Sequence, residues 1–296
     1  MDQENRVETI VDEKGQPIPR SETIPPLTKR QEEEAESRTS VTALVVHEAI
    51  RKDGDEELRR RVSALAWSGL AAGLSMGFSF LGEALFWRYL PPTAWRPLIA
   101  SLGYPLGFLI VIIGRQQLFT ENTLTAIIPL LARRNSTTLV AVLRLWAVVL
   151  VANLAGAHIF AWVVCKTPMM TPEVQRAMTE ISLTAANVTP GLAVLRGIFA
   201  GWLIAMVVWM LAATDSSRIG IIVILTYVVG LANLTHVIVG SVEVLYLVAA
   251  GLKNWLSFFA GYMAPTLMGN IIGGVSLVSA LNHAQVIAGH SGSSVR

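Results

Sequence analysis

Three hydrogen-bonding residues, Asn233, Thr235 and His236, lie together inside the apolar stretch GLANLTHVIVGSVEVLY (230–246), and Glu243 follows two helical turns later. An imidazole can donate one hydrogen bond while accepting another, and it can take up or release a proton near neutral pH. Polar groups deep in an apolar segment are costly and mark functional sites, so we expect His236 to line a path for a polar solute. A structural histidine that ties two helices together is the alternative.

A second polar interruption, RQQLFTENT (115–123), contains Thr120 and lies in another long apolar segment. Irregular backbone at bilayer depth is tolerated only where it is buried in protein or lines a water-filled cavity. A new helix that begins there exposes backbone N–H groups, which attract anions. Two such interruptions at corresponding places in the two halves of a chain indicate a midplane site between repeats. We therefore predict that Thr120 and His236 face one pore.

The composition is typical of a membrane protein. Of 296 residues, 53% are hydrophobic and 15% are charged, with a mean hydropathy of +0.53. The single cysteine, Cys165, excludes an intrachain disulfide and a Cys-based metal site. No glycine-rich phosphate loop, HExxH motif or nucleophile elbow occurs, so we expect a non-enzyme without a cofactor or metal.

Charge and periodicity divide the chain into four parts. Residues 1–40 lack periodicity and are expected to form a disordered cytoplasmic arm, whose acidic balance gives nucleic-acid binding no support. Residues 41–60 are predicted to form an amphipathic cytoplasmic helix with His47 on its surface. Residues 61–285 are predicted to form a six-span transmembrane channel domain, and residues 286–296 a cytoplasmic tail.

The predicted channel domain has six apolar segments long enough to cross a bilayer, at about 20 residues for each crossing. An even number of spans puts both termini on one side, and the ten bases among residues 1–60 place that side in the cytoplasm. The expected location is the bacterial inner membrane, with a multi-pass topology. The segments are 62–87, 97–131, 138–165, 190–213, 218–250 and 255–282.

The span after each interruption carries an asparagine among small residues, in ANLAGA (152–157) and GNIIGG (269–274). Asn153 follows Thr120 by 33 positions, and Asn270 follows His236 by 34. Small residues allow membrane helices to approach closely. The matched spacing favours an inverted repeat in which Thr120 and His236 correspond.

The chain resembles the formate–nitrite transporter family in several stretches that occur in order. They are YPLGFLIVIIGRQQLFTEN, NLAGA, GWLIAMVVWM and PTLMGNIIGG, with the histidine of the second interruption between the last two. The similarity covers about residues 45–285, and the charged arm resembles the YfdC-like inner membrane branch. The resemblance implies an all-α polytopic membrane protein. Its fold would be aquaporin-like, with six transmembrane helices, broken helices 2 and 5 and an inverted repeat. It also implies a homopentamer with a pore in each protomer.

The resemblance assigns a substrate pathway to particular residues. Thr120 and His236 occupy the two breaks, with Thr235 before the histidine, and Asn270 is expected to hydrogen-bond near His236. The residues assigned to the apolar constriction are Tyr104, Phe108, Leu118, Phe119 and Val229. Gln117 departs from the family's usual acid and Glu121 from its usual small residue, and Val229 replaces a bulky aromatic. These departures leave the substrate open.

Four ions, Glu121, Glu243, Arg115 and Arg144, fall near or within the predicted membrane depth. An unpaired charge there is costly, so we expect them to form pairs.

We predict that the chain transports small monovalent anions of the formate or nitrite type, with protons as a possible second partner. We expect uptake to strengthen as external pH falls. The alternatives are a neutral-solute pore of aquaporin type, which the absence of an Asn-Pro-Ala tripeptide disfavours, and a non-transporting membrane scaffold or sensor. The sequence leaves open which anion is carried, in which direction, and whether by a channel or by a proton-coupled transporter.

Overall fold

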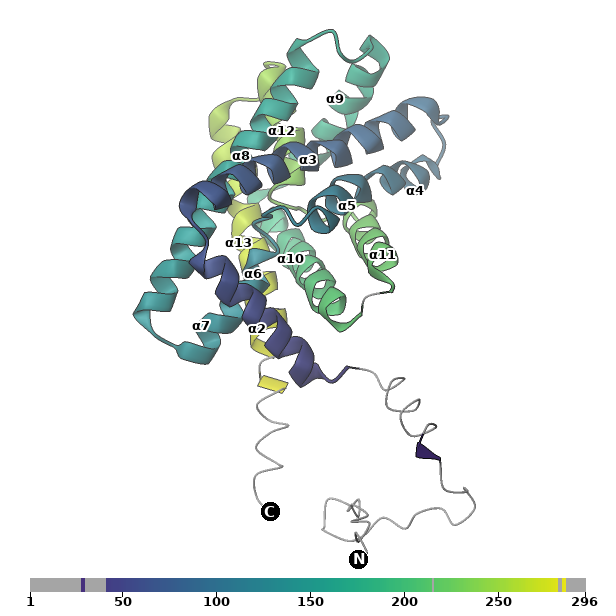
Figure 1. The fold of residues 1–296 in the computed structure, drawn as a ribbon. Coiled ribbons are helices and arrows are strands. Elements are labelled where there is room, and N and C mark those ends of the chain that lie inside the picture. Colours follow the sequence, from purple (N-terminus) through teal and green to yellow (C-terminus); the bar gives the residue numbers. More distant parts are fainter. Residues whose placement is uncertain (1–27, 30–40, 215, 282–283, 286–296) are drawn as a thin grey trace, which may run out of the picture. The chain divides into compact units, whose positions relative to one another are not determined.

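A computed structural model describes residues 28–29, 41–214, 216–281 and 284–285, and every secondary-structure element in these residues is helical (Figure 1). The chain divides into two units, Met1–Ser40 and Val41–Arg296. The predicted arm, apart from Thr28 and Lys29, and the predicted tail lie outside the described residues.

The second unit is a series of helices joined by short connections. Its first half consists of α2 (Ala43–Arg59), α3 (Val62–Tyr89), α4 (Arg96–Ala100), the 3-10 turn η1 (Ser101–Gly103), α5 (Pro105–Ile113), α6 (Asn122–Thr125), α7 (Ile127–Arg133) and α8 (Ser136–Lys166). Its second half consists of α9 (Pro172–Ala186), α10 (Pro190–Ala213), α11 (Arg218–Leu231), α12 (Val239–Ala249), the π-helical η2 (Ser257–Met263), α13 (Ala264–Ile272) and the π-helical η3 (Gly273–Ala280).

Four helical stretches in the described residues are long and apolar enough to cross a membrane: α3, Arg96–Ile113, α8 and α10. Helices α11 and α12 are apolar but shorter. Non-helical backbone interrupts each of the two unusually long predicted segments, 97–131 and 218–250, so the helices on either side of the interruption are short. Loop A (residues 114–121) lies between α5 and α6, and loop B (residues 232–238) lies between α11 and α12.

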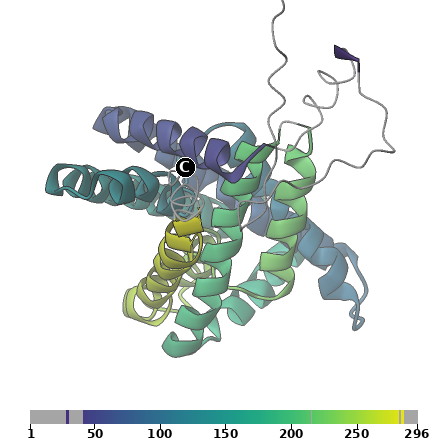
Figure 2. The ribbon, with the colours of Figure 1, turned by 90° about the horizontal axis from the view of Figure 1, so that it is seen from below.

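Two helix pairs form the frame that holds these loops, and glycine permits the close approach in each. A Cβ atom on Gly73 of α3 would lie 2.1 Å from the carbonyl oxygen of Asn153 in α8. A Cβ atom on Gly201 of α10 would lie 2.3 Å from the carbonyl oxygen of Asn270 in α13. Such small-residue contacts are a common way for membrane helices to pack. Figure 2 shows the yellow C-terminal helices beside the green α10.

Helix α2 packs against the rest of this unit at the end opposite α9 (Figure 1). Its residues Val46 and Ile50 join a small core with Leu124 of α6. Asp55 links α2 to α7 through Arg133 and also accepts from Arg51 at 2.7 Å. The prediction that His47 lies on the surface is wrong, because its exposed fraction is 7%. The amphipathic helix uses its apolar face to pack against the helical bundle.

Candidate functional site

Loops A and B begin with the same backbone turn. Arg115 and Asn233, three positions before Leu118 and His236, have φ angles of 50° and 49°. After each of them a backbone N–H reaches back five positions, from Gln116 to Val111 at 2.9 Å and from Leu234 to Val229 at 3.0 Å. This left-handed turn with a long return hydrogen bond is a common way to end a helix. It stops α5 and α11 abruptly and turns the chain toward the centre of the unit.

One buried asparagine holds each loop by three backbone contacts. The amide nitrogen of Asn153 donates to the carbonyls of Gly69 and Gln117 at 2.8 and 2.9 Å, and its oxygen accepts from the backbone N–H of Phe119 at 2.9 Å. Asn270 repeats this pattern at loop B. The amide nitrogen of Asn270 donates to the carbonyls of Gly197 and Thr235, each at 2.9 Å. Its amide oxygen accepts from the backbone N–H of Val237 at 2.8 Å. In each loop, the asparagine therefore satisfies one backbone carbonyl and one backbone N–H.

Asn270 hydrogen-bonds near His236, as expected, through the backbone on both sides of this residue. The two asparagine patterns also align His236 with Leu118, the residue between the two that Asn153 holds, and not with Thr120. The matched spacing of 33 and 34 residues therefore paired Thr120 with His236 in a register that differs by two positions from the one the asparagine contacts give.

Thr120 and His236 nevertheless meet directly. The hydroxyl oxygen of Thr120 lies 2.9 Å from Nε2 of His236, and both side chains are buried. The other ring nitrogen, Nδ1, accepts from the backbone N–H groups of Ile238 and Val239, each at 3.3 Å. Because Nδ1 faces two donors, the ring proton belongs on Nε2, where it is donated to Thr120. The hydroxyl proton of Thr120 then remains available for a further acceptor.

Aromatic and apolar side chains surround this hydrogen bond. The ring of Phe108 packs edge-on against the imidazole of His236, with 5.1 Å between the ring centroids. The ring centroids of Tyr104 and Phe108 are 5.7 Å apart. Leu118 is fully buried. Phe119 packs edge-on against Trp146 of α8 at 5.7 Å. Thr235 is fastened to α10 because its hydroxyl donates to the carbonyl of Ala193 at 2.7 Å.

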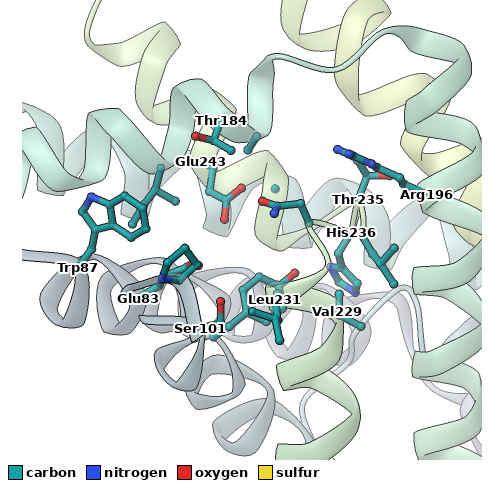
Figure 3. A pocket seen from close by; sticks show the side chains of 18 of the residues that line it. Glu83, Trp87, Ser101, Thr184, Arg196, Val229, Leu231, Thr235, His236 and Glu243 are labelled. Carbon is teal, nitrogen blue, oxygen red and sulfur yellow. The ribbon is translucent and has the colours of Figure 1, made fainter. Parts of the chain in front are cut away.

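A cavity of about 140 Å³ reaches His236 from the side of α9 (Figure 3). Of the residues assigned to the predicted pathway, Tyr104, Val229, Thr235 and His236 line this cavity. The others, Phe108, Leu118, Phe119, Thr120 and Asn270, are not among its lining residues. A volume of this size accommodates a few water molecules or one small solute. The sequence reasoning did not assign Glu83, Ser101, Arg196 or Tyr262 to this cavity. Glu243 and Gly240 were recognisable, because with His236 they form one helical stripe at intervals of four and three residues.

The expected pairing of buried ions does not occur. Arg144 donates to the backbone carbonyls of Leu58 and Arg60. Among the described residues, neither Glu121 nor Glu243 has a cationic group within 4.0 Å, and one carboxyl oxygen of Glu121 is buried without a hydrogen-bond partner. These carboxyl groups are therefore left without the compensation that a structural ion pair would give.

The fold and site define a class: an all-α membrane protein in which two non-helical loops meet at a buried threonine–histidine hydrogen bond. The family profile described as "Formate/nitrite transporter" matches residues 44–284, and the chain belongs to this family.

Particular relatives agree with this assignment. The chain is 41% identical over 251 residues to "Inner membrane protein YfdC" of Escherichia coli (strain K12), covering 85% of this chain and 81% of that protein. It is 24% identical over 241 residues to "Formate channel BtFdhC" of Bacillus thuringiensis, covering 79% and 91% of the two chains. A solved "Pentameric formate channel with formate bound" has a TM-score of 0.64 at 19% identity, covering 80% of this chain and 99% of that chain, and supports the fold.

Proposed function

We propose that the protein transports small monovalent anions of weak acids, of the formate and nitrite type, through a pore in each protomer. Membership in the formate/nitrite transporter family gives the substrate class. The observation that carries the proposal is the Thr120–His236 hydrogen bond at the inner end of a cavity, because it places two polar groups where an anion would lose its hydration.

The proposed topology has six spans in an aquaporin-like inverted repeat. The second span comprises α4 to α7 and is broken at loop A, and the fifth comprises α11 and α12 and is broken at loop B. The common turn geometry of the two loops and the matching asparagine contacts support the repeat. The similar Escherichia coli protein YfdC is described as an inner membrane protein, and we place this chain in the bacterial inner membrane as a multi-pass protein.

We place the α2 side in the cytoplasm, with both termini on that side. Arg133, Arg134 and Arg144 lie on this side, with further bases in α2, and basic residues favour the cytoplasmic face. Residues 61–285 would form the channel domain, preceded by the amphipathic helix at 41–60 and by the arm at 1–40. Deleting the arm should leave pore assembly intact, because it has too little apolar surface to take part in a packed core.

An anion would enter the cavity past Tyr104 and Val229 and reach the Thr120–His236 pair beside Thr235. The imidazole donates to Thr120, and the Thr120 hydroxyl offers its proton to the solute. Phe108, Leu118 and Phe119 would form the apolar constriction, while Asn270 holds the backbone of loop B in place. This path limits the size of the solute and excludes hydrated ions, because apolar walls and one hydroxyl donor do not replace a full hydration shell.

We further propose a homopentamer, as in the pentameric formate channel of similar fold. Large apolar residues are exposed on several helices of the single chain, among them Trp67, Val151 and Ile224, and both lipid and neighbouring protomers would cover such a surface.

A flux panel tests the proposal. Purified protein in liposomes should pass formate and nitrite well above protein-free liposomes, and should pass glycerol no faster than they do. Selective passage of glycerol would favour the neutral-solute alternative. No flux of any solute from a correctly assembled protein would favour the scaffold alternative.

A further inference from the structure

The cavity beside His236 contains two carboxyl groups that the proposed pathway does not use. Glu243 of α12 is 6% exposed, and Glu83 of α3 is half-buried. Both line the cavity, as does Arg196 of α10 (Figure 3). Figure 3 shows the carboxyl group of Glu243 pointing into this space. A site that attracts anions would not ordinarily present two negative groups and one positive group to them.

Glu243 lies on the solute's approach to His236. The N–H of Gly240 donates to the carbonyl of His236 at 3.0 Å, so a single turn joins the end of loop B to α12. His236, Gly240 and Glu243 lie at intervals of four and three residues, and all three line the cavity. Seven residues correspond to about 10 Å along a helix axis. The hydroxyl of Tyr262 occupies the space next to Gly240, where an added Cβ would be 1.6 Å from it. An entering solute therefore passes Glu243 before it reaches the imidazole.

Neither carboxyl group is neutralised by a fixed partner. Within the part of the chain that the structure describes, Glu83 and Glu243 have no cation within 4.0 Å and no hydrogen bond. They are close enough to interact electrostatically with each other. Two ionised carboxylates in one small cavity repel each other and repel an anion. A protonated carboxyl group instead donates a hydrogen bond to the anion.

The surroundings contain few other groups that titrate or carry charge. Helix α9, which packs against α12, contributes Ile181, Thr184 and Ala185, none of which is ionisable. On α8, His158 packs against Trp255. The titratable or charged groups that line the cavity with Glu243 are Glu83, Tyr104, Arg196, His236 and Tyr262.

We infer that Glu243 hands a proton to the entering anion, so that a weak-acid anion and one proton cross together. This inference rests on the proposed function. The O–H bond of Glu243 breaks, its electron pair stays on the glutamate, and a new O–H bond forms on an oxygen of the solute. The resulting carboxylate recovers its proton from water on the α9 side, and the neutral acid moves on to the Thr120–His236 pair. Net transfer is one anion and one proton, without movement of charge.

The experiment measures formate uptake into proteoliposomes at external pH values between about 5 and 8, with a potassium gradient and valinomycin setting the membrane potential. A dye inside the vesicles reports proton entry, and protein-free liposomes give the background from formic acid crossing the bilayer. The parent protein should take up formate faster at lower external pH, with matching proton entry and no response to the imposed potential.

Three variants separate proton transfer from structure. Glu243→Gln keeps the shape and a hydrogen-bond donor but cannot release a proton, so uptake at acidic pH should fall about tenfold and lose its pH dependence. Glu243→Asp should restore the pH dependence, since it can carry a proton. Glu83→Gln alters the opposite wall of the same cavity and should keep the pH dependence, because Glu243 is still present. Size-exclusion chromatography checks that each variant assembles.

The possible outcomes are distinct. If the assembled parent protein passes no formate above the background, the proposed function fails and the inference fails with it. If the parent passes formate but Glu243→Gln has the same pH profile and the same indifference to potential, the proposed function stands and the role of Glu243 is wrong. Parent uptake that follows the imposed potential would also overturn the inference, because the anion would then cross alone.

Discussion

The hydroxyl of Thr120 and Nε2 of His236 lie 2.9 Å apart although 116 positions separate them in the sequence. Each belongs to a short loop that ends one helix and begins another, and each loop is held by its own asparagine. The contact therefore depends on two asparagine clasps, by which we mean the hydrogen bonds of Asn153 to loop A and of Asn270 to loop B. Changes in either clasp should affect the Thr120–His236 distance.

Replacing Thr120 by valine should impair both stability and formate flux, whereas Thr120→Ser should preserve them. Valine keeps the side-chain shape but leaves the buried Nε2–H of His236 without its acceptor, at a cost of about 1–3 kcal/mol. Thermal unfolding in detergent and flux in liposomes measure the two effects. Thr226→Val is the control, since that buried hydroxyl donates to the Ile222 carbonyl of its own helix. Equal flux in the Thr120→Val variant and the parent would contradict this role.

The two asparagine clasps should be comparable in strength. Asn153→Ala and Asn270→Ala each leave one loop carbonyl and one loop N–H without the asparagine partner, and each unpaired buried group costs about 1–3 kcal/mol. We expect both variants to lower the melting temperature markedly and to a similar extent. Asn187→Ala, at an exposed position, should leave it unchanged. A large loss in only one of the two clasp variants would show that the loops are not equivalent in energy.

Close helix contact through glycine gives a matched set of tests. Gly73→Ala and Gly201→Ala should destabilise the protein, because each added methyl group would lie within 2.3 Å of a backbone oxygen that cannot move alone. Overpacking of this kind costs about 1–3 kcal/mol. Gly191→Ala is the control, as nothing lies within 4 Å of its added Cβ. An equal change in melting temperature for Gly191→Ala, Gly73→Ala and Gly201→Ala would contradict the role of close packing at Gly73 and Gly201.

The apolar constriction is tested by Phe108→Ala. Phe108 is fully buried with its ring against His236, so its removal should open space beside the imidazole and loosen selection by size. We expect lactate or glycerol to leak at a measurable rate through this variant. Leu106→Ala changes an exposed residue of the same helix and should not alter selectivity. Parent-like selectivity in Phe108→Ala would remove it from the constriction.

The sequence predicted the helical class, and its two polar interruptions coincide with loops A and B, because both depend on local signals: apolar length, polar interruptions and residue type. That Thr120 and His236 face one pore stays a prediction. The expected correspondence between the two loops was wrong by two positions, because the residues that the asparagine contacts align, Leu118 and His236, differ in chemistry. The shared left-handed turns at Arg115 and Asn233 reveal the alignment only in three dimensions.

The cavity was harder to predict than the loops. Glu83 and Arg196 come from helices far apart in sequence, and nothing in their own surroundings places them together. The expected ion pairs were wrong for a related reason. The free-energy cost of burying a charge does not by itself produce an ion pair, because an opposite charge must also lie within reach. Arg144 instead donates to carbonyl groups at the end of α2.

The most direct test of the central claim is formate flux through the parent protein and through His236→Asn in liposomes. Asparagine caps helix N-termini well and can accept from the backbone of α12, so the variant should assemble as the parent does. We expect parent flux well above protein-free liposomes and flux at least about tenfold lower in the variant, a difference of about 1.4 kcal/mol in the barrier. Equal flux in an assembled variant would mean that His236 is a tie between helices, and that the anion does not pass at the Thr120–His236 pair.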